Sequence, residues 1–217
     1  MWPKVQVALD LLDLDEALSI ADQCIEAGVD WIEAGTPLIN SCGMEAIRAL
    51  KKRFPDHYVV ADTKALDVGF LSVEMCAQAG ADTVGIAGAA TDYTIMSAVE
   101  AAKDYDVDLV ADLIAVKDPI KRGKTLGNLG VDYLEYHLSI DEREYAHRVF
   151  PFDIVKKLSK LPLPLSVAGG LDDEKSPLAV QNGANVVVVG GYITKSEDPR
   201  LRAQTIIEAL EQFRGDE

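Results

Sequence analysis

Val-Val-Ala-Asp-Thr-Lys-Ala-Leu-Asp, residues 59–67, is the stretch on which the interpretation of this chain depends. A short apolar run ends there in two carboxylates and one ammonium group. Side chains alternate between the two faces of a strand, so we expect Asp62 and Lys64 to point the same way, with Val60 behind them. Asp67 lies beyond the strand, where the chain should turn into a helix. Because charges at the mouth of an apolar strand are costly to desolvate, we interpret this stretch as the floor of an active site.

The same pattern recurs along the chain: a β-rich run, an amphipathic segment, and a restart such as Gly-Ala-Asp. Strands are expected at 5–10, 30–34, 58–63, 82–87, 107–112, 132–137, 164–168 and 185–190. Helices are expected at about 14–27, 43–53, 70–79, 92–103, 118–128, 151–159, 174–182 and 199–214. Glycines that follow four of the helical segments suit left-handed C-caps; they are Gly28, Gly80, Gly130 and Gly183.

Eight strands, each followed by a helix, predict an α/β protein of the (β/α)8 barrel type. No linker or low-complexity stretch divides the chain, so we expect a single domain over residues 1–217. The alternative is an open doubly wound sheet. Against it, no Gly-x-Gly-x-x-Gly fingerprint follows the first strand.

Composition narrows the class of partner. The net charge of −15 leaves no basic stripe to neutralise phosphates, so we expect no nucleic acid partner. The three cysteines fit no metal motif and are expected to be free thiols in a reducing cytosol. No signal-peptide region or membrane-length apolar run is seen, so we predict a cytoplasmic protein without a membrane partner.

A barrel places functional side chains where its strands end, and polar residues do recur at those points. The predicted strand-end residues are Asp10, Glu33, Asp62, Lys64, Asp112 and His137, and glycine pairs (Gly169-Gly170 and Gly190-Gly191) follow the last two strands. Six polar strand ends on one face are difficult to explain by stability alone.

Two interpretations of the acidic residues stay open. Glu33 and Asp62 suit Mg²⁺, which prefers hard oxygen ligands, but each could simply pair with Lys64. Lys64 could stabilise an oxyanion or only neutralise its neighbours, and it should stay protonated in either case. Asp67 stands where a helix N-cap belongs, and from the residues alone the cap is the favoured interpretation.

His137 is the natural acid or base near neutral pH. Alternation places Glu135 on the same face, one layer deeper, where it could orient the histidine or pair inside the barrel. The two glycine pairs favour a phosphate bound by backbone N–H groups, with tight turns as the alternative.

With these residues assembled, the segment 62–67 resembles the Asp-x-Lys-x-x-Asp signature of the orotidine 5′-phosphate decarboxylase suprafamily. Within that suprafamily the chain is most similar to the 3-hexulose-6-phosphate synthases. The resemblance covers nearly the whole chain, including 7–10, 31–39 and 167–170.

The resemblance implies an aldol reaction between ribulose 5-phosphate and formaldehyde, giving 3-hexulose 6-phosphate, with Mg²⁺ or Mn²⁺ as a substitute. By similarity Glu33 and Asp62 hold the metal, Lys64 supports an enediolate, and His137 removes the C1 proton. Asp67 would reach into the partner subunit's site of a homodimer, which overrides its interpretation as a mere cap. The remaining substrate-binding residues are Asp10, Asp112, Ala168, Gly169, Gly170, Gly190 and Gly191.

Three positions separate this group from the related 3-keto-L-gulonate 6-phosphate decarboxylases, which are the alternative function. The decarboxylases typically carry Glu, Arg and Thr where this chain has Asp112, Ile140 and Ala168. Orotidine monophosphate decarboxylation is disfavoured, because it uses no metal and its site lacks counterparts of Glu33 and His137.

One departure from the family stands after the last strand. Most relatives carry Gly-Arg there, and this chain has Gly190-Gly191. Phosphate affinity must then rest on backbone amides or on a substitute such as Lys195. The missing arginine is also the one hint of a non-catalytic sugar-phosphate sensor.

Overall fold

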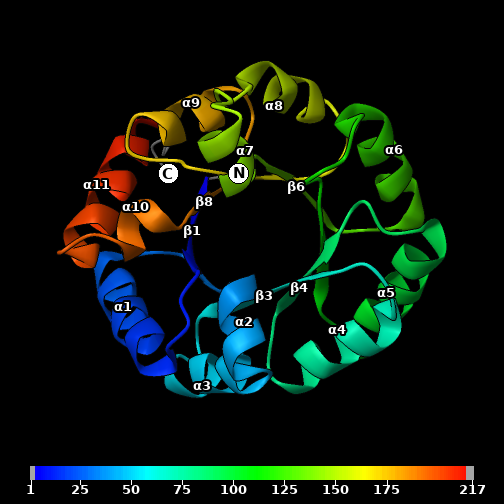
Figure 1. Cartoon of the computed structure of the whole chain (residues 1–217), viewed down its shortest axis with the longest axis horizontal. Coiled ribbons are helices and arrows are strands. Elements are labelled where there is room, and N and C mark those ends of the chain that lie inside the picture. The colour runs from blue at the N-terminus through cyan, green and yellow to red at the C-terminus, as the bar shows by residue number, and fades with distance from the viewer. Residues whose placement is uncertain (1–2, 214–217) are drawn as a thin grey trace.

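A computed structural model describes residues 3–213, which form a closed barrel of eight parallel strands in sequence order. Figure 1 looks down the barrel axis. The strands are β1 (Lys4–Leu9), β2 (Trp31–Ala34), β3 (Tyr58–Ala65), β4 (Thr83–Ala87), β5 (Asp108–Asp112), β6 (Tyr133–His137), β7 (Leu165–Ala168) and β8 (Val186–Val189). β8 pairs with β1 and closes the barrel. The predicted (β/α)8 barrel is therefore confirmed, and the open sheet is wrong.

Outer helices cover the barrel, as Figure 1 shows. They are α1 (Leu14–Ala27), α3 (Glu45–Arg53), α4 (Gly69–Gln78), α5 (Asp92–Tyr105), α6 (Pro119–Leu129), α8 (Phe152–Leu158), α9 (Lys175–Gln181) and α11 (Pro199–Leu210), followed by the 3₁₀ turn η1 (Glu211–Phe213). Each predicted helix is found within a few residues of its expected bounds. Residue 214, the predicted end of the last one, lies outside the described residues.

The helix ends follow from local sequence. Asp13, Thr91, Asp118 and Asp198 accept hydrogen bonds from backbone N–H groups of the first turns of α1, α5, α6 and α11. All four glycines predicted to terminate helices have left-handed φ angles of 98° to 100°.

Three short helices were not predicted. α2 (Thr36–Cys42), α7 (Ile140–Tyr145) and α10 (Gly191–Thr194) lie in the connections that follow β2, β6 and β8. Each is too short to show helical periodicity in the sequence. In Figure 1 all three lie inside the ring of outer helices, and because they follow strand ends they border the mouth of the barrel.

The barrel interior changes in character along its axis. At the end where the strands begin, Trp31 stacks on Tyr58 with ring centroids 4.4 Å apart, and Tyr58 bonds to Asp108 and Thr83. Ala8, Ala168, Val186 and Val188 pack together with Trp31 as an apolar cluster inside the barrel. The space beside the strand ends is thus left for polar side chains.

The cysteines and the helices fit the remaining expectations about chemistry and membranes. Cys24, Cys42 and Cys76 are all free thiols, and burial raises the pKa of Cys24 and Cys76 to about 12. No helix within the described residues is both long and apolar enough to cross a bilayer.

Candidate active site

A bulge in β3 positions its charged residues. The pairing with β4 shifts between Asp62 and Ala65, and Lys64 has a left-handed φ of 48°. The Thr63 hydroxyl donates to the carbonyl of Gly85 at 2.7 Å and pins the bulge. Asp62 and Lys64 form an ion pair, so they do point the same way, but an irregular strand and not simple alternation brings them together.

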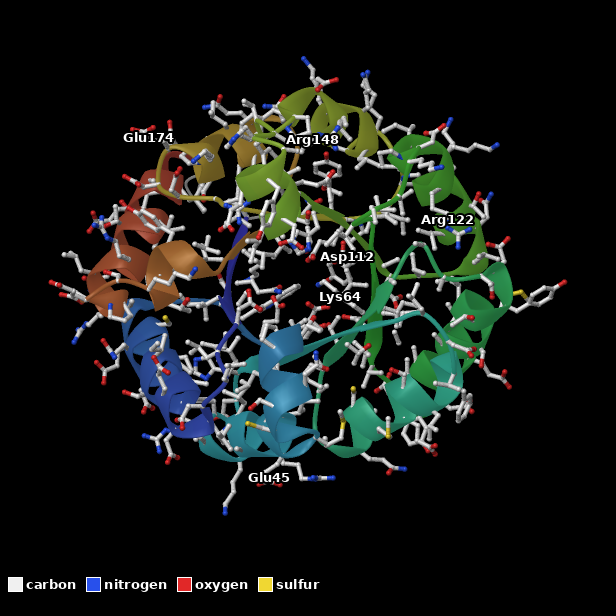
Figure 2. All side chains as sticks on the ribbon, viewed as in Figure 1. Glu45, Lys64, Asp112, Arg122, Arg148 and Glu174 are labelled. Atoms are coloured by element: carbon white, nitrogen blue, oxygen red, sulfur yellow. The ribbon has the colours of Figure 1, made fainter. Side chains whose placement is uncertain are left out.

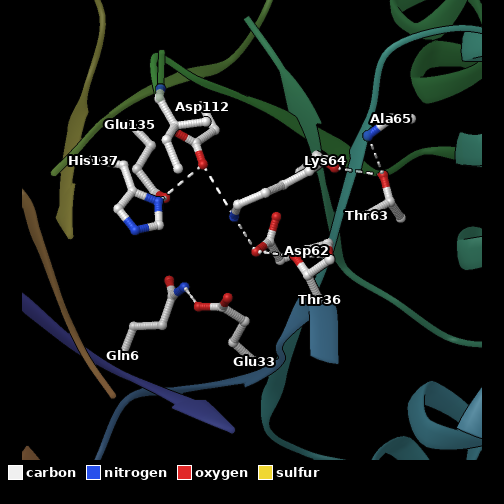
Figure 3. Close-up of polar contacts among 12 residues, drawn as sticks. Gln6, Glu33, Thr36, Asp62, Thr63, Lys64, Ala65, Asp112, Glu135 and His137 are labelled. Atoms are coloured by element: carbon white, nitrogen blue, oxygen red, sulfur yellow. Dashed lines mark hydrogen bonds and ion pairs between the residues drawn. The ribbon is translucent and has the colours of Figure 1, made fainter. Parts of the chain in front are cut away.

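Asp112, at the end of β5, links lysine and histidine. Its Oδ2 lies 3.1 Å from Lys64 Nζ and 3.0 Å from His137 Nδ1, and its Oδ1 accepts from the N–H of Ile114 at 2.7 Å (Figure 3). Burial alone would raise the pKa of Asp112, but the contacts with His137 and Lys64 outweigh it and lower that pKa. The carboxylate therefore stays charged at neutral pH.

Lys64 stays charged for a related reason. Burial favours the neutral amine, but Asp62, Asp112 and Glu135 outweigh it and raise the pKa of the ammonium. A permanently protonated lysine can stabilise a developing oxyanion and cannot act as a free amine nucleophile. The expectation that Lys64 stays protonated is borne out by this geometry.

His137 is held by one of its two ring nitrogens. Nδ1 faces Asp112 at 3.0 Å and Glu135 Oε1 at 3.6 Å, and Nε2 has no hydrogen-bond partner within residues 3–213. A charged Asp112 favours the proton on Nδ1, which leaves the lone pair of Nε2 available as a base. Glu135 therefore does lie beside the histidine, and burial, followed by the charges of Asp112 and Glu33, raises its pKa well above the ordinary range.

A second carboxylate group lies beside Lys64. Glu33 is 6% exposed and accepts a 2.6 Å hydrogen bond from Gln6, while Thr36 donates to Asp62 Oδ2 at 2.8 Å (Figure 3). Burial and the charges of Asp62 and Asp10 raise the pKa of Glu33 well above its usual range. The pKa of Asp10 is raised in turn by desolvation and by Asp62.

These carboxylates have the chemistry of a Mg²⁺ site. Asp62 pairs with Lys64, as the metal-free alternative required, but Glu33 bonds to Gln6 instead, and its Oε1 accepts no hydrogen bond within the described range. Crowded, buried, hard oxygen donors are the surroundings that favour a divalent cation. The residues present therefore fit the metal.

A second group of possible ligands lies close by. Within residues 3–213, ligand atoms of Asp112, Glu135 and His137 lie within 4.8 Å of one another. However, Asp112 Oδ2 already contacts Lys64 and Nδ1 of His137, so a cation here would compete with two positively charged or donor groups. Glu33 and Asp62 are the better candidates.

Asp67 is not an N-cap. α4 begins at Gly69, its N-cap residue is Val68, and no side chain caps it. The Asp67 carboxylate accepts only the N–H of Val68, at 2.8 Å, because the left-handed φ of Val68 (51°) turns the chain before the helix starts. Asp67 is exposed and shares no contact with Lys64 or Asp112 within its own barrel.

The glycine pairs lie at the same mouth as the charged residues. Ala168 is in register with His137, and Gly169-Gly170 follow it at the end of β7. A Cβ on Gly169 would overlap the backbone of Leu138, so this loop is pressed against the end of β6. Gly190 lies beside Asp10, and Gly191 opens α10.

Sequence reasoning missed three side chains of the site. Gln6 and Thr36 are uncharged partners of Glu33 and Asp62, and Arg143 lies against Gly170. Gln6 could have been found as the one amide within the apolar run of the first strand. Arg143 could not, because it stands in a charged stretch that has the appearance of ordinary surface.

Comparisons with known proteins agree with this site. The family model described as Orotidine 5'-phosphate decarboxylase / HUMPS family matches residues 3–206. A 3-hexulose-6-phosphate synthase of Mycobacterium gastri is 39% identical over 210 residues, which cover 95% of this chain and 99% of that protein.

Solved structures give the same result. The 3-hexulose-6-phosphate synthase from Salmonella typhimurium is 36% identical, with a TM-score of 0.91 and coverage of 96% and 99% of the two chains. KGPDC from Streptococcus mutans, solved in complex with a sugar phosphate, is 28% identical, with a TM-score of 0.91 and coverage of 98% and 99%. The matched signature, the full-length identity and the common barrel make this chain an enzyme of the Orotidine 5'-phosphate decarboxylase / HUMPS family.

Proposed function

We propose that this enzyme is a Mg²⁺-dependent aldehyde-lyase that condenses D-ribulose 5-phosphate with formaldehyde to 3-hexulose 6-phosphate, and catalyses the reverse reaction. The observation that carries the proposal is the continuous contact from Asp62 through Lys64 and Asp112 to His137, with Glu33 alongside. It combines a base, a fixed positive charge and metal-binding oxygens at one strand end, as enolisation of a ketose requires.

The similar proteins support the substrate. The M. gastri relative is named a 3-hexulose-6-phosphate synthase, and the S. mutans neighbour was solved with a sugar phosphate bound. Both cover nearly the whole of this chain. A sugar phosphate is therefore the substrate class we propose, with formaldehyde as the second reactant.

The site residues suggest how the reaction proceeds. His137 Nε2 takes the C1 proton of the ketose phosphate, and the charge that develops on the enediolate oxygen lies beside the Lys64 ammonium. Asp112 holds the imidazole and stabilises its protonated form. When bound at Glu33 and Asp62, Mg²⁺ supplies Lewis-acid polarisation of the substrate oxygens. C1 then attacks the formaldehyde carbon, and the new alkoxide takes a proton from His137.

Decarboxylation of 3-keto-L-gulonate 6-phosphate is the second candidate. Ile140, 47% exposed at the start of α7, places an apolar side chain where an arginine could have organised water for protonation of a carbanion. Asp112 and Ala168 likewise match the synthase pattern. These three residues favour aldol chemistry and make the decarboxylase at most a side activity.

We also propose a homodimer that shares its active sites. Asp67 points away from its own cluster, and apolar side chains crowd the surface around it. The exposed apolar residues of this part of the chain are Leu66, Val68, Leu71 and Met75 near α4 and Tyr93 and Met96 on the adjacent α5. A surface of this kind is typical of an interface. The free thiols favour the cytoplasm as the location.

One assay tests the function. Formaldehyde loss is measured with ribulose 5-phosphate, with and without EDTA, beside release of CO₂ from 3-keto-L-gulonate 6-phosphate. We expect formaldehyde consumption that EDTA abolishes and Mg²⁺ or Mn²⁺ restores. Turnover that survives EDTA would remove the metal role of Glu33 and Asp62. Faster CO₂ release than formaldehyde loss would replace the synthase with the decarboxylase.

A second assay tests the base. His137→Ala should stop exchange of the C1 proton of ribulose 5-phosphate with D₂O, followed by NMR. Exchange at the wild-type rate would mean that another group removes the proton. Binding of ribulose 5-phosphate without any formaldehyde-dependent turnover in the wild type would instead support a sensor.

A further inference from the structure

Arg143 differs from every other arginine that the structure describes. Arg48, Arg53, Arg122, Arg148, Arg200 and Arg202 each donate side-chain hydrogen bonds to a carboxylate or a hydroxyl. Within residues 3–213 the guanidinium of Arg143 has no such partner, and its Nε is buried and unsatisfied. A buried, unpaired N–H of a charged group is costly, so its retention needs an explanation.

The surroundings of Arg143 exclude a simple surface ion pair. The protein carries a net charge of −15, and Glu142 is the adjacent residue in the chain. Glu142 nevertheless pairs with Arg148 at 2.5 Å and leaves Arg143 alone. In this acidic protein, a guanidinium without a carboxylate is thus not the result of a shortage of carboxylates.

The guanidinium lies against the loop after β7. A Cβ on Gly170 would overlap Arg143 Nη1 and come within 2.8 Å of its Cζ, so a glycine at this position makes room for the charged group. Arg143 belongs to α7, which lies inside the ring of outer helices in Figure 1. Gly170 itself follows Ala168, which is in register with His137. The unpaired charge is therefore next to the mouth that holds the catalytic histidine.

A second cation borders the neighbouring loop. Lys195 is exposed and forms no ion pair among the described residues, and a Cβ on Gly191 would lie 3.5 Å from its Cδ and Cε. The positive charge of Lys195 acts on Asp10 at the end of β1. The loops after β7 and β8 thus each carry glycines and one unpaired cation.

We propose that Arg143 is the principal phosphate-binding side chain of this enzyme, with Lys195 as its partner across the loops after β7 and β8. A phosphate dianion would accept from the guanidinium and from backbone N–H groups of the glycine loops, and would satisfy the buried Nε. The inference rests on the proposed sugar-phosphate substrate. It assigns to α7 the charge that the Gly190-Gly191 pair does not provide.

The test compares Arg143→Gln with Arg148→Gln. Arg148 lies five residues further along the same segment and is paired with Glu142, so its variant removes an equal charge from the same region. For R143Q we expect the KM for ribulose 5-phosphate to rise about 10- to 100-fold with kcat within a few-fold of wild type. The increase in Tm caused by inorganic phosphate should be lost in R143Q and retained in R148Q.

A rescue variant separates a binding role from a purely structural one. Gly191 has no left-handed φ, and a Cβ added there would meet its neighbours only at ordinary contact distances, so the position can accept a side chain. Adding Gly191→Arg to R143Q should restore most of the phosphate-induced increase in Tm. A structural brace between α7 and Gly170 would not be replaced from β8.

The remaining outcomes are decisive in the same way. Phosphate stabilisation of R143Q equal to that of wild type would overturn the inference. If R143Q does not fold, wild-type protein is treated with phenylglyoxal and analysed by mass spectrometry: phosphate should protect Arg143 and not Arg148, and equal modification with and without phosphate would overturn the inference. Failure of the proposed function is distinguishable, because it would appear as absent formaldehyde turnover while phosphate binding still depended on Arg143.

Discussion

A single oxygen of Asp112 faces two groups that must act together. Its Oδ2 lies close to Lys64 Nζ and to His137 Nδ1, while Ile114 fixes the other oxygen. The negative charge of Asp112 therefore does two things: it keeps the proton of neutral His137 on Nδ1, and it helps to hold Lys64 beside Asp62. In Figure 2 Asp112 and Lys64 meet near the centre of the barrel, far from the charged residues of the rim.

Asp112→Asn tests this dual role. The amide keeps the shape but loses the charge, so His137 is no longer held in the tautomer that exposes a basic Nε2. We expect kcat to fall about 10²- to 10³-fold with the fold retained, measured by steady-state kinetics and circular dichroism. Asp108→Asn, which alters the contact with Tyr58 at the opposite end of the barrel, is the control. It should change Tm more than kcat; equal losses of kcat in the two variants would contradict the assignment.

Glu135 gives a prediction about pH. In the unfolded chain a glutamate titrates near pH 4.3, whereas burial, then Asp112 and Glu33, raise its pKa well above that in the fold. A raised pKa contributes stability that is present below the unfolded value and is lost as pH rises through the folded value. Glu135→Gln cannot lose a proton, so its stability relative to wild type should increase from pH 4 to pH 8.

Urea unfolding at pH 4, 6 and 8 measures this difference. Glu45→Gln is the matched control, because Glu45 lies on the outside of the barrel, as Figure 2 shows. The free-energy difference between E45Q and wild type should stay nearly constant over the same range. A constant difference for E135Q would show that Glu135 does not titrate as inferred.

At the scale of elements, the connections at the mouth carry the site. α2, α7 and α10 follow β2, β6 and β8, and they bring Thr36, Arg143 and Lys195 to the rim of the barrel. The outer helices, by contrast, provide the apolar face on which the strands pack. Loops thus add chemistry to a scaffold that does not depend on them.

The connection after β5 gives an element-scale prediction. Ala115 is exposed and has a φ of 60°, a left-handed conformation that a side chain with a Cβ disfavours by about 1–2 kcal/mol. Ala115→Gly should therefore increase the free energy of unfolding by up to about 1 kcal/mol, which corresponds to about 2–4 °C in Tm. Ala209→Gly within α11 should do the opposite, because glycine weakens a helix. A decrease in Tm for A115G would show that the loop is not strained.

The sequence predicted the regular elements well because their patterns are local. Apolar runs and glycine C-caps located the eight strands and outer helices, and the barrel topology then placed Asp62, Asp112 and His137 at one end. The bulge at Lys64 could not be predicted, since it depends on pairing with β4. The N-cap assigned to Asp67 was wrong because Val68 adopts a left-handed conformation that delays the helix.

At the scale of the whole molecule, the surface around α4 and α5 differs from the rest. The protein is strongly acidic, yet Leu71, Met75 and Met96 are exposed on these two helices, close to Asp67 in the chain or in space. A second copy related by two-fold symmetry would cover the apolar side chains and carry its own Asp67 toward this barrel's mouth. That arrangement explains why Asp67 makes no contact with the charged cluster of its own chain.

Complementation between two inactive variants tests the shared site. Asp67→Ala would spoil the neighbouring barrel, and His137→Ala would spoil its own, so each homodimer should be inactive. In a mixed dimer, the barrel with intact His137 receives Asp67 from the other chain and is complete. Because half of the dimers in an equal mixture are hybrids with one good site of two, about a quarter of wild-type activity should return after co-refolding.

The control for this experiment removes association itself. Met75→Glu introduces a charge into the apolar surface of α4, so the two chains should separate in sedimentation and the mixture should no longer recover activity. Both single variants need a wild-type Tm for the comparison to hold. Full activity of D67A alone, or no recovery on mixing with H137A while both remain dimeric, would place Asp67 outside the site. Recovery near a quarter would locate each active site between two chains, with β3 contributing Asp62 and Lys64 to one and Asp67 to the other.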